Sequence, residues 1–124
     1  TVYVDIKIQS QESLLAESDF VSLHVPAQKD YVIGAKEFNQ MKDGASIVNA
    51  ARGGVIDEVA LLKALDSGKL SFAGLDTFEE EPKPAMQVLM HSKVSLTPHI
   101  GAATGEAQDR IGEELAQQIA AILL

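Results

Sequence analysis

The chain has 124 residues, of which 46% are hydrophobic and 23% charged, so it is long enough for one domain with a buried core. Its formal net charge of −8 argues against nucleic acid and anionic membranes as partners, because both attract basic surfaces. It contains no cysteine, which excludes disulfides and fits a cytoplasmic location, and no apolar run approaches the length of a membrane span.

Strand and helix patterns alternate along the chain. Residues 2–8 alternate apolar and polar side chains, which is typical of a half-exposed strand. The apolar run at residues 45–50 is typical of a strand covered on both faces. Ser10 and Asp57 stand where helix N-caps are expected, and Gly68 stands at a helix end. The predicted strands cover residues 1–8, 21–25, 45–50, 72–76 and 94–97. The predicted helices cover residues 10–16, 35–41, 57–68 and 104–124, with a helical turn at 86–90.

This alternation indicates βαβ crossovers and a mainly parallel sheet, which is an α/β architecture. The chain contains no internal repeat, low-complexity segment or linker that would divide it. We therefore expect one α/β unit over residues 1–124, ending in a long helix with an apolar stripe.

Side chains that carry chemistry follow three of the predicted strands. Arg52 comes before two glycines, Asp76 precedes an acidic run at Glu79–Glu81, and His99 follows the last strand. Ligands bind at the carboxyl ends of the strands in open α/β sheets. A guanidinium suits a carboxylate, and an imidazole exchanges protons near neutral pH. The three segments together predict an active site.

The residues taken singly leave structural roles open. Arg52 could form a surface ion pair with Asp57 or Glu58, and Asp76 could accept hydrogen bonds from nearby backbone N–H groups. A lone histidine such as His99 is more often structural than catalytic, and the acidic run would ordinarily be a solvated loop. Physical reasoning alone does not select one of its three glutamates.

Two kinds of site are not predicted. The three histidines, His24, His91 and His99, lack the spacing of metal ligands, so we expect no metal site. The Gly53-Gly54 pair is no phosphate loop, because neither Walker spacing nor G-x-G-x-x-G occurs in the chain.

With these residues in place, the chain resembles the D-isomer-specific 2-hydroxyacid dehydrogenase family, and within it the phosphoglycerate dehydrogenases. The resemblance runs from about Ser10 to the C-terminus. It is carried by motifs in family order: Leu14–Phe20, Leu23-His24-Val25-Pro26, Met41–Ala45, Asn49–Leu62, Gly74–Pro82 and Thr97–Thr104. It implies the C-terminal half of a Rossmann-like, doubly wound NAD-binding domain.

The resemblance also implies roles for the site residues. Arg52 corresponds to the arginine that clamps the substrate carboxylate, His99 to the general acid/base, and Glu81 to the acid paired with that histidine. Asp76 corresponds to the residue that holds the nicotinamide carboxamide. The positions implied to line the NAD cleft are His24, Pro26, Ala50, Arg52, Asp76, His99, Gly101 and Ala102.

The implied reaction is hydride transfer between NAD(H) and a small 2-hydroxy or 2-oxo acid, with a phosphoglycerate-like substrate favoured. The family's G-x-G-x-x-G turn and its substrate-binding domain are expected to lie outside the chain, so the isolated chain is expected to be inactive. A non-catalytic relative that senses NAD or binds protein is the alternative. We also expect homodimers, or association through an uncovered sheet edge and the terminal helix.

Overall fold

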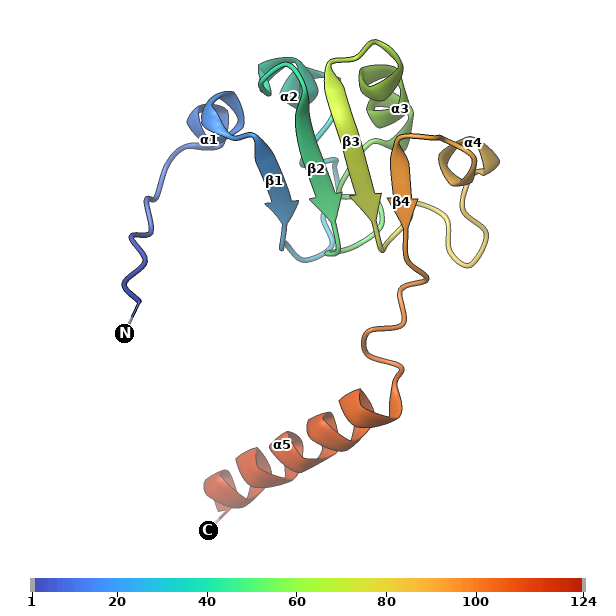
Figure 1. Cartoon of the computed structure of the whole chain (residues 1–124). Coiled ribbons are helices and arrows are strands. Elements are labelled where there is room, and N and C mark those ends of the chain that lie inside the picture. Colours follow the sequence, from blue (N-terminus) through green and yellow to red (C-terminus); the bar gives the residue numbers. More distant parts are fainter. Residues whose placement is uncertain (1, 124) are drawn as a thin grey trace.

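The computed structural model describes residues 2–123 and contains one parallel sheet whose strands follow the order β1-β2-β3-β4. The strands are β1 (Phe20–Leu23), β2 (Ala45–Asn49), β3 (Leu70–Leu75) and β4 (Val94–Leu96). The helices are α1 (Gln11–Glu17), α2 (Ala35–Gln40), α3 (Glu58–Asp66), α4 (Met86–Leu89) and α5 (Gly105–Leu123). Consecutive parallel strands joined by helical crossovers confirm the α/β prediction and the expected half of a doubly wound sheet (Figure 1).

The helix boundaries follow local capping chemistry. Ser10 accepts a hydrogen bond from the Ser13 N–H at the start of α1, and Asp57 Oδ1 accepts one from the Ala60 N–H, 2.9 Å away, at the start of α3. Gly68 follows α3 with φ +77°, a left-handed conformation that glycine adopts without strain. These interactions confirm the predicted caps.

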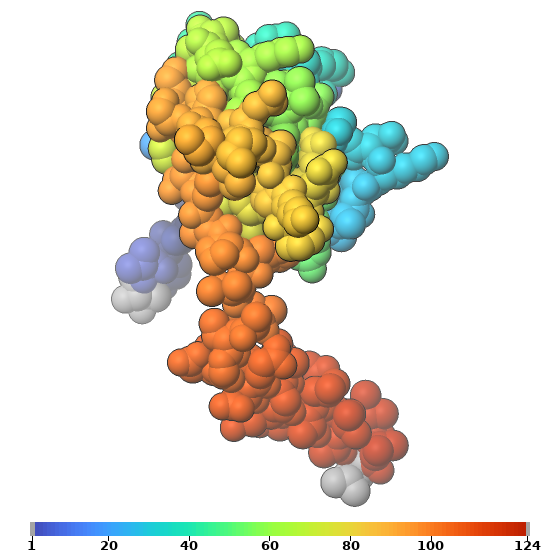
Figure 2. Space-filling model, turned by 90° about the vertical axis from the view of Figure 1, so that its right-hand side faces the viewer, coloured from blue at the N-terminus to red at the C-terminus, as the bar shows by residue number. Residues whose placement is uncertain are grey.

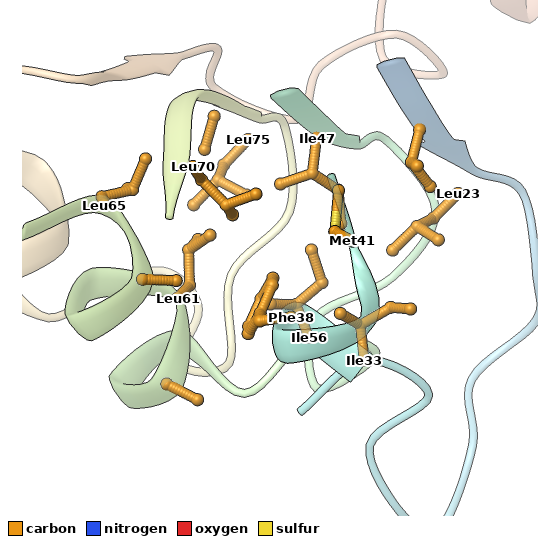
Figure 3. Packing of buried hydrophobic residues seen from close by; sticks show 14 of the residues in the cluster. Leu23, Ile33, Phe38, Met41, Ile47, Ile56, Leu61, Leu65, Leu70 and Leu75 are labelled. Carbon is orange, nitrogen blue, oxygen red and sulfur yellow. The ribbon is translucent and has the colours of Figure 1, made fainter. Parts of the chain in front are cut away.

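The core lies between the sheet and the helices on one of its faces (Figure 3). Ile47 of β2 and Leu61 of α3 are fully buried. Val48, the neighbour of Ile47 on the other face of β2, is 44% exposed, and Phe20 of β1 is 82% exposed. The prediction that the strand at residues 45–50, now β2, is covered on both faces is therefore wrong for this chain, because the helices of the domain pack against only one face of the sheet.

The prediction of a strand at residues 1–8 is also wrong for residues 2–8, and residue 1 lies outside the described residues. Residues 2–9 form neither helix nor strand, and their apolar side chains are 78–95% exposed. An alternating pattern becomes a strand only when a neighbouring strand supplies hydrogen bonds, and this segment pairs with none of the described strands.

The long terminal helix predicted at 104–124 is confirmed by α5 up to Leu123, and residue 124 lies outside the described residues. Thr104 caps its first turn by accepting a hydrogen bond from the Ala107 N–H. The helix extends away from the body of the domain (Figures 1 and 2). Ile111 and Leu115 in its apolar stripe are about half exposed, and Ile122 is 82% exposed. None of the helices within residues 2–123 combines the length and the hydropathy that crossing a membrane requires.

Candidate active site

The residues singled out from the sequence lie at the carboxyl edge of the sheet. Because all the strands are parallel, the segments that follow them meet at this edge (Figure 1). His24 and Pro26 follow β1, Ala50 and Arg52 follow β2, Asp76 and Glu81 follow β3, and His99, Gly101 and Ala102 follow β4.

The clearest interaction at this edge joins Glu81 and His99. The Nδ1 atom of His99 lies 3.0 Å from Oε2 and 3.2 Å from Oε1 of Glu81, and Oε1 also accepts from the Phe78 N–H at 3.1 Å. The hydrogen bond from His99, followed by that from the Phe78 N–H, holds the pKa of Glu81 below its ordinary value of 4.5. Glu81 is thus the member of the acidic run that the structure brings against the histidine.

The backbone of His99 is held by Asp76. His99 has a φ of +53°, which is unfavourable for a residue with a side chain. Asp76 Oδ1 accepts from the His99 N–H at 3.0 Å and from the Thr97 hydroxyl at 2.5 Å. Asp76 therefore does bond a nearby backbone N–H, and its Oδ2 forms no hydrogen bond within residues 2–123, so it can accept from a ligand.

The loop that carries Arg52 is shaped by Asn49, which is only 2% exposed. The Asn49 side chain donates to the Arg52 carbonyl at 3.0 Å and accepts from the Ala51 N–H at 3.1 Å. The Arg52 guanidinium donates to the Ala51 carbonyl and forms no ion pair within the described part of the chain. The alternative in which Arg52 forms a surface ion pair with Asp57 or Glu58 is therefore not observed, and the guanidinium remains available to a ligand.

Gly53 brings the Arg52 loop against the loop that carries Glu81. A Cβ atom at Gly53 would lie 1.8 Å from the Phe78 carbonyl oxygen, so only glycine fits between these two backbones. The close approach fixes the distance between the two loops.

Two hollows flank the segment from Thr97 to His99. One, of about 600 Å³, lies beside the uncovered face of the sheet and is lined by Ala50, Asp76 and Gly101 among others. The other, of about 440 Å³, is mostly apolar and borders Glu81 and His99. A ligand in either hollow would lie next to the polar groups at the carboxyl edge.

Three predicted residues lie apart from this cluster. The His24 ring bonds the Ser22 hydroxyl at 2.8 Å, the Pro26 carbonyl accepts from Gln28, and Ala102 lines a separate hollow at the start of α5. No interaction within residues 2–123 ties them to the Glu81–His99 pair.

Sequence reasoning gave no role to Asn49 or Thr97. It considered Glu58 only as a possible partner of Arg52, and Glu79 only as one member of the acidic run. Asn49 is a polar residue at the end of an apolar strand, and this position was the one signal that could have pointed to it. The other contacts depend on which loops meet in space.

The fold and this edge define a nucleotide-binding α/β domain with an acid–histidine pair. The model of the "D-isomer specific 2-hydroxyacid dehydrogenase, NAD binding domain" family matches residues 2–101, and the chain belongs to this family. The chain is 48% identical to hydroxypyruvate reductase of Thermotoga maritima, covering 94% of this chain and 38% of the relative. It is 44% identical to D-3-phosphoglycerate dehydrogenase of Archaeoglobus fulgidus, covering 94% and 23%.

Solved structures agree with this assignment. D-mandelate dehydrogenase of Rhodotorula graminis superposes with a TM-score of 0.76 at 44% identity, over 81% of this chain and 30% of that one. D-lactate dehydrogenase of Aquifex aeolicus, solved with NAD and lactic acid, gives 0.76 at 36% identity, over 93% and 40%. The chain thus spans well under half the length of the relatives it matches.

Proposed function

We propose that the chain forms the part of an NAD-dependent D-2-hydroxyacid dehydrogenase that holds the nicotinamide end of the cofactor and exchanges the substrate proton. The observation that carries this proposal is the hydrogen-bonded Glu81–His99 pair at the carboxyl edge of the sheet, beside Asp76. The family assignment supports the same reading.

His99 is the proposed general acid/base. Because Glu81 faces Nδ1, that nitrogen donates to the carboxylate, and Nε2 is left to face the substrate. Protonated Nε2 gives its proton to the carbonyl oxygen of a 2-oxo acid, and in the reverse direction neutral Nε2 takes the hydroxyl proton. The negative charge of Glu81 stabilises the imidazolium between these steps.

The other proposed roles concern orientation. The unpaired guanidinium of Arg52 would hold the substrate carboxylate through its planar fork. The free Oδ2 of Asp76 suits the carboxamide N–H donors of nicotinamide, in the hollow lined by Ala50 and Gly101. When bound, NAD supplies the hydride acceptor or donor. We assign further parts of the cofactor cleft to His24, Pro26 and Ala102.

The phosphoglycerate-like substrate remains our preferred one, although the relatives' names also include hydroxypyruvate, glyoxylate and 4-methyl-2-oxopentanoate. The chain alone should not turn over substrate, since it holds no G-x-G-x-x-G phosphate turn. Loss of oriented binding removes on the order of 7–11 kcal/mol of help with the barrier.

A chimera tests this function. We would place residues 2–123 in the matching segment of Thermotoga maritima hydroxypyruvate reductase and follow NADH oxidation with hydroxypyruvate and glyoxylate, and NAD reduction with D-3-phosphoglycerate. We expect turnover, at least a thousandfold reduced by His99→Ala, roughly the upper range of what acid–base catalysis contributes. His91→Ala is the matched control and should retain activity. A folded chimera without turnover would contradict the proposal.

We also propose that a second copy covers the apolar surfaces left open on this chain, which are the free face of the sheet and the stripe of α5. Phe20, Phe72 and Leu115 are 82%, 43% and 55% exposed, and exposed apolar patches commonly mark surfaces that bind another protein. Light scattering should give twice the 13.2 kDa of one chain, and Leu115→Asp should restore the monomer mass.

A further inference from the structure

Glu58 and Glu79 exchange two hydrogen bonds between segments far apart in the sequence. The Glu58 N–H donates to Glu79 Oε1 at 2.8 Å, and the Glu79 N–H donates to Glu58 Oε1 at 2.8 Å. Glu79 Oε2 also accepts from the Tyr31 hydroxyl at 3.3 Å. Each carboxylate therefore binds the backbone of the other residue, an arrangement that fixes both position and orientation.

The exchange anchors the loop that presents Glu81. Glu58 is the first residue of α3, where backbone N–H groups lack partners within the helix and favour a carboxylate. Phe78, the residue before Glu79, donates its N–H to Glu81 Oε1, and Glu81 bonds the His99 ring. The chain of contacts therefore runs from the start of α3 to the histidine.

The same anchor reaches the Arg52 loop, because α3 begins a few residues after it. Gly53, the residue after Arg52, lies against the carbonyl of Phe78, the residue before Glu79. The exchange between Glu58 and Glu79 thus fixes the loop bearing the acid–histidine pair relative to the loop bearing Arg52.

Keeping two carboxylates here has an electrostatic cost. Glu58 is only 7% exposed, and its burial raises its pKa above the ordinary value. The hydrogen bond from the Glu79 N–H opposes this rise, whereas the negative charges of Glu79 and Glu80 add to it. A helix N-cap is already supplied by Asp57. Capping alone therefore does not account for this arrangement.

We propose that Glu58 and Glu79 are positioning residues for the proposed dehydrogenase reaction, holding Glu81 in the place where it bonds His99. The inference rests on the proposed function for its meaning in catalysis. The geometry it predicts can be measured without substrate or cofactor.

The first experiment uses NMR on the 124-residue chain. We would titrate the Glu81 carboxyl carbon and record the His99 ring nitrogens in Glu58→Ala and Glu79→Ala. Since the hydrogen bond from His99 is the largest cause of the low Glu81 pKa, that pKa should rise toward 4.5 in both variants. Glu80→Ala is the matched control, because the Glu80 side chain bonds nothing within residues 2–123 and its loss should leave the titration unchanged.

Conservative variants separate positioning from charge. Glu58→Gln and Glu79→Gln keep the accepting Oε1 and should preserve the Glu81–His99 contact. Glu79→Asp retains the charge but shortens the side chain by one methylene, so it should lose the contact, and it replaces the alanine variants if they fail to fold by circular dichroism. Folded alanine or aspartate variants with the Glu81 titration of the parent chain would overturn the proposal, even if they melt at lower temperature.

The second experiment measures turnover in the chimera. Glu79→Ala should lower kcat by on the order of tenfold to a hundredfold with little change in KM, as expected for a misplaced catalytic group. A change confined to KM would contradict positioning of the acid–histidine pair. If the parent chimera is inactive while the NMR result holds, the proposed function fails and the positioning of Glu81 stands.

Discussion

The Thr77 hydroxyl offers a sharp test of the packing at the candidate site. Thr77 is 1% exposed, and its Oγ1 atom is buried without a hydrogen-bond partner within residues 2–123. Valine has nearly the same shape and the same branching at Cβ, so Thr77→Val replaces the hydroxyl with a methyl group without altering rotamer freedom. The substitution should therefore stabilise the chain.

The size of the effect follows from the burial. A buried polar group without a partner costs about 1–3 kcal/mol, and a newly buried methyl contributes about 0.8 kcal/mol. We expect the free energy of unfolding to rise by about 2 kcal/mol. With a urea m-value of roughly 2 kcal/mol/M, the midpoint should rise by about 1 M.

The assay is urea unfolding followed by circular dichroism, with Thr97→Val as the matched control. The Thr97 hydroxyl donates to Asp76 at 2.5 Å, so the same chemical change should there lower stability by about 1 kcal/mol. We expect the free energy of unfolding to rise for Thr77→Val and to fall for Thr97→Val. A destabilising Thr77→Val would refute the reasoning, because it would mean that this hydroxyl has a partner in solution.

The remaining predictions concern two glycines and the acid–histidine pair. Gly53→Ala should lower stability by about 3 kcal/mol in the same assay, since its Cβ would meet the Phe78 carbonyl oxygen at 1.8 Å. Gly112→Ala, within α5 with nothing inside 4 Å, should instead raise the helix content and stability by up to about 1 kcal/mol. Glu81 has a lowered pKa in the folded chain, so its bond to His99 adds stability above pH 4.5 that is lost as pH falls through the folded-state value. Unfolding curves of the parent and Glu81→Gln should therefore differ near neutral pH and converge in acid, and a gap that widens on acidification would contradict this sign.

Local patterns in the sequence predicted most of the elements. Ser10 and Asp57 as caps and the apolar stripe of α5 depend only on neighbouring residues along the chain, so they could be read directly. The parallel sheet followed from the alternation of elements, and it placed the segments around Arg52, Asp76 and His99 at one edge.

Tertiary structure decided what depends on partners distant in sequence. The alternating residues 2–9 remained unpaired because no described strand lies beside them, and Val48 remained half exposed because helices cover one face only. Without the family resemblance, the acidic run could not be resolved, since only the packing of two loops brings Glu81, and not its neighbours, to His99. The exchange between Glu58 and Glu79 joins residues 21 positions apart, and no local pattern encodes such a contact.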